Sequence, residues 1–251
     1  MMRPMLELDR IYHMDCLQGM SLLPDHSIDM VLCDLPYGTT QCRWDAIIPF
    51  DALWAHYRRI VKENGAIVLF SSQPFTAALV NSNLPMFRYE WIWHKPRPTG
   101  FLNAKRMPLK AHENILVFYR KLPVYHPQMT HGHIRKVAHA RYESGGDGES
   151  IYGKEVRDTL YDSTDRYPLD VQIFSSGDQT KKYHPTEKPV ALCEYLIKTY
   201  TDPGEVVLDN CIGSGTTAVA CLRCGRRFIG FETELQYVLK ARERINLEKM
   251  G

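Results

Sequence analysis

Two short stretches of the chain combine residue types that can do chemistry, and each follows a mostly apolar run. The run 28–33 leads into Asp34–Tyr37, so a carboxylate and an aromatic ring arrive together on a turn. The run 205–208 leads into Asp209 and the glycine-rich residues 213–217. Glycines let a backbone approach a ligand closely, and a helix N-terminus that follows them favours a negative group. The first stretch predicts a catalytic loop, and the second predicts a ligand-binding turn.

A further strand-like run, 227–231, ends at the carboxylate Glu232, where the hydroxyls of a ribose could be held. With the glycine-rich turn it predicts a half-fold that binds a nucleoside. Gly213, Gly215 and Ala218 also satisfy the G-x-G-x-x-G/A pattern, so a dinucleotide cofactor has to be weighed. Only 19 residues follow Glu232, too few for the remaining strands of such a domain. A phosphate-binding P-loop is excluded because no Lys follows the glycines.

Positive charge is concentrated in residues 91–121, which hold seven Lys or Arg against the single acid Glu113. Trp91, Trp93 and Phe101 are interleaved with these bases, a combination that favours nucleic acid as the partner. The alternative is a set of solvated loop charges. The residues predicted to contact DNA are Lys95, Arg97, Lys105, Arg106 and Lys110.

These residues need a scaffold, and the alternation of apolar runs with helical patterns predicts an α/β fold with a mostly parallel sheet. Ligands of doubly wound sheets bind at the carboxyl ends of the strands, which is where both motifs fall. We expect seven strands, at 10–14, 28–33, 66–70, 87–93, 113–119, 205–209 and 227–232. We expect helices at 49–63, 73–82, 189–201, 215–224 and 234–248.

Composition fits one compact domain, since 44% of the 251 residues are hydrophobic and 24% are charged. No apolar run approaches the length of a membrane span, and the N-terminus lacks the apolar core of a signal peptide. Seven scattered cysteines, an odd number, argue against a disulfide framework. A cytoplasmic protein is therefore expected, with no membrane partner.

The segment 121–182 interrupts the alternation of strands and helices. A stretch of this length without regular structure inside a compact domain tends to be functional. We therefore expect 1–251 to be a single domain with a catalytic half at 1–120, a target-recognition insert or lid at 121–182, and a cofactor-binding half at 183–251.

The order of three motifs resembles that of the β-class DNA amino-methyltransferases, which use S-adenosylmethionine. In that family a D-P-P-Y tetrapeptide is followed by a recognition segment, then by H-P-T-x-K-P and D-x-x-x-G-S-G-T-T. Here Asp34–Tyr37, His184–Pro189 and Asp209–Thr217 occur in this order. The resemblance covers most of the chain except about 121–182. It implies a Rossmann-like methyltransferase fold in a circularly ordered chain, a restriction-modification context, and S-adenosylmethionine as the cofactor with no metal.

The resemblance also implies roles for individual residues. The residues expected in catalysis are Asp34, Leu35, Pro36 and Tyr37, with Leu35 standing where the family usually has Pro and supplying a backbone carbonyl equally well. The residues expected to bind the cofactor are Asp15, Thr186, Lys188, Asp209, Gly213, Ser214, Gly215, Thr216, Thr217 and Glu232. Asp15 would read the adenine amino group of the cofactor, and Thr186 and Lys188 would lie near its carboxylate. For Lys188, a surface charge ahead of the next helix is the alternative.

The implied reaction is methyl transfer to N6 of a flipped-out adenine in DNA, because the family habit is Asp at the first motif position for adenine and Ser for cytosine. Cytosine N4 is the nearest alternative, followed by an RNA adenine methyltransferase. An inactive DNA-binding module and a nicotinamide-dependent oxidoreductase are further alternatives. The expected partner is DNA, double-stranded or single-stranded. The sequence does not decide whether the protein forms a homodimer.

Three sets of tempting residues are assigned no chemistry. Cys33 ends an apolar strand beside an acid, which does not favour the thiolate that carbon-5 chemistry on cytosine needs. Cys221 and Cys224 form a lone C-x-x-C, more typical of thiols in the core than of zinc ligands. The pair His131 and His133 has no accompanying ligand cluster.

Overall fold

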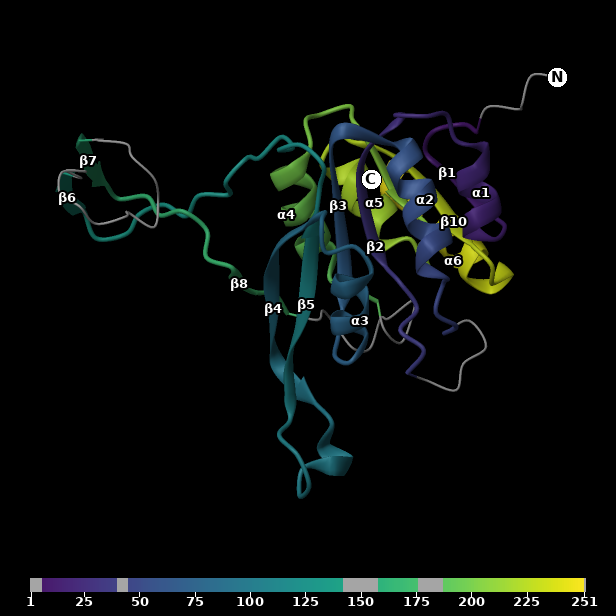
Figure 1. Ribbon diagram of the computed structural model, residues 1–251, viewed down its shortest axis with the longest axis horizontal. Helices are drawn as coiled ribbons and strands as arrows, with labels where there is room; N and C mark the ends of the chain where they lie inside the picture. Colours follow the sequence, from purple (N-terminus) through teal and green to yellow (C-terminus); the bar gives the residue numbers. More distant parts are fainter. Residues whose placement is uncertain (1–5, 40–44, 142–157, 176–186, 251) are drawn as a thin grey trace. The chain divides into compact units, whose positions relative to one another are not determined.

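The computed structural model describes residues 6–39, 45–141, 158–175 and 187–250 (Figure 1). The chain divides into two compact units, one comprising 1–126 with 170–251 and the other 127–169. The larger unit contains a twisted sheet with helices on both faces. Within the described residues, no helix is both long and apolar enough to cross a membrane.

The main sheet of the larger unit has eight described strands in the order β1-β10-β9-β2-β3-β5-β4-β8. The strands are β1 (Arg10–His13), β2 (Ile28–Asp34), β3 (Val61–Ser71), β4 (Phe87–Thr99), β5 (Lys110–Phe118), β8 (Val171–Ile173), β9 (Val206–Asp209) and β10 (Arg227–Glu232). β5 runs antiparallel to both of its neighbours, β3 and β4, and the other described pairings of this sheet are parallel. The expected doubly wound, mostly parallel α/β fold is confirmed.

The sequence predicts seven strands and gives no sign of β8, which pairs parallel with β4. Three residues are too few to show the alternation of apolar and polar side chains that identifies a strand. β8 is extended because it pairs with β4, not because of a pattern in its own sequence. The helix expected at 49–63 ends at Ile60, because Val61 already pairs with Ile28 as the first residue of β3. A short helix after Asp15 was also missed.

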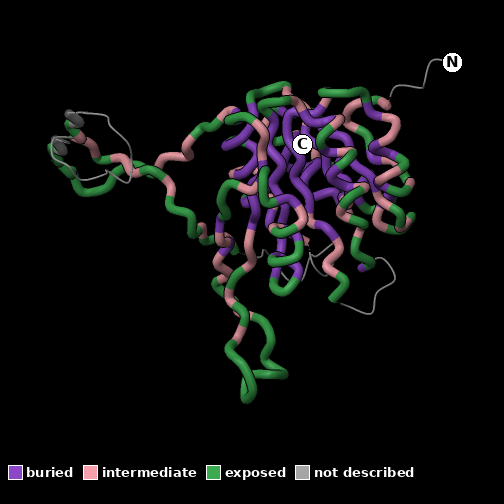
Figure 2. Tube along the Cα trace, viewed as in Figure 1, coloured by how far each residue is buried: buried purple, intermediate pink, exposed green. Residues whose placement is uncertain are grey.

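The described helices are α1 (Cys16–Leu22), α2 (Phe50–Ile60), α3 (Phe75–Ser82), α4 (Val190–Tyr200), α5 (Thr216–Arg223) and α6 (Leu235–Met250). Two hydrophobic clusters lie on opposite faces of the sheet. One joins the sheet to α4, α5 and α6, and the other joins it to α1, α2 and α3. Figure 2 shows buried residues running through the middle of this unit.

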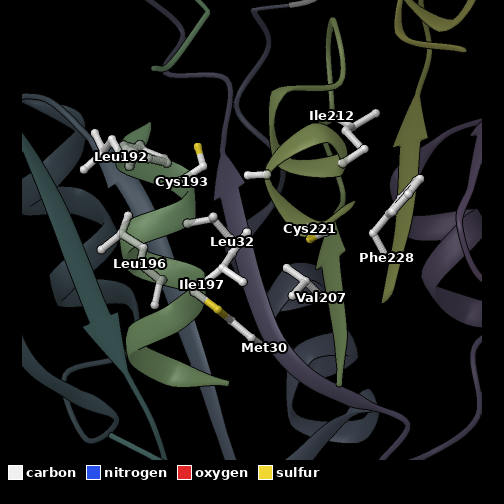
Figure 3. Packing of buried hydrophobic residues seen from close by; sticks show 14 of the residues in the cluster. Met30, Leu32, Leu192, Cys193, Leu196, Ile197, Val207, Ile212, Cys221 and Phe228 are labelled. Carbon is white, nitrogen blue, oxygen red and sulfur yellow. The ribbon is translucent and has the colours of Figure 1, made fainter. Parts of the chain in front are cut away.

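β2 shows why the sheet carries helices on both faces. Successive side chains of a strand point to opposite faces, and those of β2 alternate between the two clusters. Met30 and Leu32 pack with α4, whereas Val31 and Cys33 pack with the opposite cluster. Figure 3 shows Met30 and Leu32 beside Ile197 of α4. A strand covered on both faces is apolar over most of its length, as residues 30–33 of β2 are.

The smaller unit contains an antiparallel pair formed by β6 (Lys136–Arg141) and β7 (Asp158–Ser163). The guanidinium of Arg135 makes two hydrogen bonds with the carboxylate of Asp162, at 2.7 and 2.6 Å. An isolated antiparallel β-bridge joins Thr130 and Arg166 in the same unit. The segment predicted to be an irregular insert therefore includes a strand pair, and its compact part is narrower than the expected 121–182.

Candidate active site

A cavity of about 790 Å³ opens at the carboxyl ends of β2, β9 and β10. Its volume lies within the range of roughly 300–1,000 Å³ that is typical of small-molecule sites. β2 and β9 are neighbours, with Val31 opposite Leu208, and the chain leaves β2 toward β3 but leaves β9 toward β10. Adjacent parallel strands whose connections diverge leave a crevice where ligands bind. This arrangement brings the N-terminal tetrapeptide and the C-terminal glycine turn side by side.

Asp34 is the last residue of β2, and its carboxylate lines the cavity. The hydroxyl of Tyr37 donates a 2.7 Å hydrogen bond to Oδ1 of Asp34. The Tyr37 ring stacks on Phe75 of α3, with centroids 5.0 Å apart. Burial and the neighbouring Asp34 raise the pKa of Tyr37 well above its usual range, so the phenol remains a donor. Leu35 is buried, and Pro36 also lines the cavity.

The backbone after the tetrapeptide is held by Asp45, a residue that the sequence analysis did not select. Oδ1 of Asp45 accepts hydrogen bonds from the backbone N–H groups of Tyr37 and Gly38, at 2.7 and 2.9 Å. Oδ2 accepts a third from Thr39 at 2.9 Å. A buried carboxylate with three backbone donors fixes the path of a loop. An acid a few residues beyond a Pro-Tyr-Gly turn is a weak signal, but it could have suggested this role.

Lys188 lies immediately before α4, and its side chain is only 9% exposed. Its ammonium forms an ion pair with Oδ2 of Asp34 and lies 3.3 Å from Oε2 of Glu113. Burial by itself would lower the pKa of Lys188, but the negative charges of Asp34 and Glu113 outweigh it and raise the pKa. The ammonium of Lys188, predicted to lie near the cofactor's carboxylate, is thus paired with Asp34 of the predicted catalytic loop. The alternative of a surface charge is wrong, because the side chain is buried.

Glu113, on β5, is the single acid of the basic stretch, and that isolation was a signal the sequence analysis noted without assigning it a role. Its other oxygen, Oε1, pairs with the ammonium of Lys95 on β4. Burial opposes ionisation of Glu113, but Lys188 and Lys95 outweigh it and lower the pKa. Lys95 was predicted to contact DNA, and the structure instead places it in the cavity wall, 11% exposed.

The glycine-rich turn adopts a conformation that needs glycine. Gly213 and Gly215 have φ values of +52° and +85°, a region that other residues rarely adopt. Gly215 caps α5, and a Cβ there would lie 2.9 Å from Cβ of Ala241. Asp209, 5% exposed, accepts hydrogen bonds from the Thr217 hydroxyl at 2.6 Å and the Cys211 N–H at 3.1 Å. Burial raises the pKa of Asp209 to about 6.

Glu232 ends β10 at the mouth of the same cavity. Its Oε2 accepts a 2.9 Å hydrogen bond from the N–H of Gly213, and its Oε1 accepts one of 2.8 Å from the N–H of Glu234. Asp15 also lines the cavity, where its Oδ1 accepts from the N–H groups of Leu17 and Gln18 and caps α1. Asp15 and Glu232 thus each hold a backbone turn while facing the cavity.

The remaining predicted residues fall into three groups. Ser214, Thr216 and Thr217 are buried at the start of α5 and line the cavity. Thr186 lies outside the described residues. Burial raises the pKa of the Cys33 thiol to about 12, as expected for a cysteine without a nucleophilic role.

The predicted DNA contacts separate into exposed and tethered residues. Arg97, Lys105 and Arg106 are exposed at the outer ends of β4 and β5 and the connection between them. Lys110 is also exposed, but its ammonium donates a hydrogen bond to the hydroxyl of Ser72, and partial burial lowers its pKa. The structure therefore brings the described residues that were predicted to act in catalysis and cofactor binding together around one cavity. It leaves Arg97, Lys105 and Arg106 on an exposed arm, from which Arg97 also lines the cavity.

This geometry fits S-adenosylmethionine. The glycine turn provides close backbone approach, and the carboxylates of Asp15 and Glu232 face the cavity as acceptors for an amino group and ribose hydroxyls. Residues 28–243 match the DNA methylase family, so the chain belongs to this family of S-adenosylmethionine-dependent DNA amino-methyltransferases. Its cofactor is S-adenosylmethionine.

The chain is similar to two Type II methyltransferases along nearly its whole length. It is 27% identical to M1.MboII of Moraxella bovis over 258 aligned residues, covering 94% of this chain and 96% of that protein. It is 26% identical to M.HpaI of Haemophilus parainfluenzae, covering 96% of this chain and 76% of that protein. These relatives support a restriction-modification context.

Solved structures show the same fold. The crystal structure of the M1.HpyAVI–SAM complex is 25% identical, with a TM-score of 0.63 over 94% of this chain and 98% of the other. The cytosine-N4-specific PvuII DNA methyltransferase is 16% identical, with a TM-score of 0.66 over 95% of this chain and 90% of the other. At that identity the second similarity concerns the fold alone.

Proposed function

We propose that this protein transfers a methyl group from S-adenosylmethionine to N6 of adenine in DNA. The observation that carries the proposal is Asp34, a carboxylate at the end of β2 that faces the cavity and is held in place by Tyr37 and Lys188. A carboxylate at the first position of the tetrapeptide is the adenine habit of the family that the sequence resembles. Cytosine N4 is the alternative that the experiment must distinguish.

The cofactor would be held by this chain's own turns. Glu232 and Asp15 would accept hydrogen bonds from it, and the backbone at Gly213 and Gly215 would permit its close approach. When bound, S-adenosylmethionine supplies an electrophilic methyl group on a sulfonium, so the protein need only position the acceptor and stabilise charge.

The target amine is a weak nucleophile because its lone pair is delocalised into the ring of the base. Asp34 can accept one of its hydrogens, since Tyr37 and Lys188 leave lone pairs free on the carboxylate oxygens. The backbone carbonyl of Leu35 would accept the other hydrogen. Two acceptors placed in this way favour a pyramidal nitrogen, whose lone pair is then available for transfer.

The base has to leave the duplex before its amine can reach Asp34. Extrusion costs a few kcal/mol, and stacking on an aromatic ring returns about 1–3 kcal/mol. Tyr37 would supply that ring, because its hydrogen bond to Asp34 and its stacking on Phe75 hold it rigidly beside the carboxylate. The exposed bases Arg97, Lys105 and Arg106 would contact the phosphates.

The three-part organisation is part of the proposal. Residues 1–120 would supply the catalytic loop and the basic arm, and residues 183–251 would supply the cofactor site. The unit at 127–169, with its β6–β7 pair, would contribute to recognition of the target sequence.

Mass-spectrometric nucleoside analysis tests the proposal. DNA from methylation-deficient cells expressing the protein is compared with DNA from cells expressing Asp34→Ala or the matched control Asp51→Ala, an exposed acid on α2. We expect N6-methyladenine with the unchanged protein and the control, and none with Asp34→Ala. Appearance of N4-methylcytosine would overturn the base assignment while keeping the reaction class.

A further inference from the structure

Four charged side chains from four different segments meet in the wall of the cavity. Lys188 pairs with both Asp34 and Glu113, and Glu113 pairs in turn with Lys95. The side chains of Lys188, Glu113 and Lys95 are 9%, 14% and 11% exposed. The two negative and two positive charges balance, so the cluster is neutral as a whole.

Glu113 owes its place to the sheet rather than to a loop. It lies opposite Trp93 in the antiparallel β4–β5 ladder. Lys95 is two residues beyond Trp93, so both point to the same face, and its ammonium lies 4.8 Å from the centre of the Trp93 ring. Central strands are the most rigid part of such a fold, and a carboxylate fixed there holds its partners firmly.

The position of Glu113 determines how Lys188 is shared. An ammonium has three donors, and a buried one needs partners for them. With Glu113 ionised, the ammonium of Lys188 is divided between two carboxylates. Without that charge, Asp34 would be its sole anionic partner, and the ammonium would compete with the target amine for the lone pairs of Asp34.

We propose that Glu113 is a positioning residue for methyl transfer, which acts by drawing the Lys188 ammonium partly away from Asp34 and so leaves that carboxylate able to accept the target amine. The inference rests on the proposed function in one respect, namely that Asp34 contacts the amine. It assigns a role to Glu113 that neither the motifs nor the fold predicts.

The charge of Glu113 also bears on the pH dependence of the reaction. The groups around the Lys188 ammonium are Asp34 on β2, Tyr37 on the loop after it, Glu113 and Lys110 on β5, Lys95 on β4 and Cys193 on α4. Removing the negative charge of Glu113 lowers the pKa of Lys188, because burial is then opposed by Asp34 alone. Lys188 holds the Asp34 carboxylate in place only while it is protonated, so the alkaline limb of the rate profile should move to lower pH.

The test uses Glu113→Gln, which keeps the shape and removes the charge, together with Lys188→Met and the double variant. Glu63→Gln is the matched control, since Glu63 pairs with Arg120 at 3.0 Å and does not line the cavity. Single-turnover rates of labelled methyl transfer to total DNA are measured from pH 7 to 11, because the raised pKa of Lys188 places its titration in the unchanged protein at the alkaline end of this range. Binding of S-adenosylhomocysteine is measured by calorimetry.

We expect Glu113→Gln to slow transfer about tenfold or more, the effect of disturbing one hydrogen bond to a charged group. The midpoint of the alkaline limb of this variant should lie about one pH unit or more below that of the unchanged protein. The affinity for S-adenosylhomocysteine should stay within about twofold, and the control should match the unchanged protein. In the Lys188→Met background, Glu113→Gln should have no further effect, because Glu113 acts through Lys188.

Three results would overturn the inference. Glu113→Gln could transfer methyl groups at the unchanged rate. It could slow the reaction equally with and without Lys188, or it could lower both stability and cofactor affinity with the alkaline limb unmoved. Because the assay counts methyl groups on any base, a finding of N4-methylcytosine would defeat the proposed base while leaving this comparison intact.

Discussion

The hydroxyl of Tyr37 donates a 2.7 Å hydrogen bond to Oδ1 of Asp34, so the ring and the carboxylate of one tetrapeptide form a single unit. Because Phe75 stacks on the same ring, α3 also supports that unit. The carboxylate is thereby held from one side by a phenol and from the other by an ammonium. A change to either donor should therefore alter how the carboxylate is positioned.

Tyr37→Phe should slow methyl transfer about tenfold, because it removes one hydrogen bond to Asp34 and keeps the stacking ring. Tyr37→Ala should be slower still, since it removes the ring as well. Single-turnover kinetics at saturating cofactor and DNA measure both rates. Equal rates for Tyr37→Phe and the unchanged protein would show that the hydroxyl has no part in holding the carboxylate.

Glu232→Gln should weaken cofactor binding about tenfold, because a neutral amide accepts more weakly from the Gly213 N–H and from a ribose. Calorimetric titration with S-adenosylhomocysteine measures the effect without any turnover. Glu243→Gln, on the exposed surface of α6, serves as the control. The assignment of Glu232 fails if both variants bind equally well.

Charge removal at Arg97, Lys105 and Arg106 should weaken DNA binding mainly at low salt. For every phosphate that is no longer neutralised, the slope of log K against log salt should become shallower by about 0.9. Fluorescence anisotropy over a salt series compares the triple Gln variant with Lys121→Gln, another exposed base. An unchanged slope would mean that the arm lies away from the phosphates.

Asp209→Asn should change how stability depends on pH. Burial raises the pKa of Asp209 to about 6, whereas an unfolded Asp titrates near ~3.9, so the native state binds the proton more tightly. The unchanged protein then loses stability from this group as the pH rises from about 4 to 6. Urea unfolding should show the variant gaining about 2–3 kcal/mol relative to the unchanged protein across that interval. A constant difference between the two would contradict the raised pKa.

Gly215→Ala should destabilise the fold more than Gly225→Ala. Both glycines have positive φ, at +85° and +69°, so both variants carry backbone strain. Only the first also brings a Cβ to 2.9 Å from Ala241, and nothing lies within 4 Å of the second. We expect the free energy of unfolding to fall by about 2–4 kcal/mol in Gly215→Ala and by about 1 kcal/mol in Gly225→Ala, as measured by urea unfolding. Equal losses would show that α6 shifts at Ala241 to accommodate the added Cβ without a measurable cost.

The sequence by itself determined which residues were predicted to form the site, and the structure places them around one cavity. Asp34, the glycine turn and Glu232 each follow a strand-like apolar run, and the ends of parallel strands meet at one edge of a sheet. These signals are local, because a few neighbouring residues decide whether a strand ends in a tight turn. The fold class followed from the same alternation of strands and helices.

Only the tertiary structure decided which of these residues touch. Lys188 meets Asp34 across 154 positions, and Tyr57 of α2 reaches Asn210 across 153 with a 2.6 Å hydrogen bond. Glu113 and Lys95 meet because β4 and β5 pair with Trp93 opposite Glu113, and this local register also places Lys95 in the cavity wall rather than on the exposed arm. Strand order and register arise from the packing of the whole sheet, so no local pattern encodes them, and the buried ion pairs of the site depend on both.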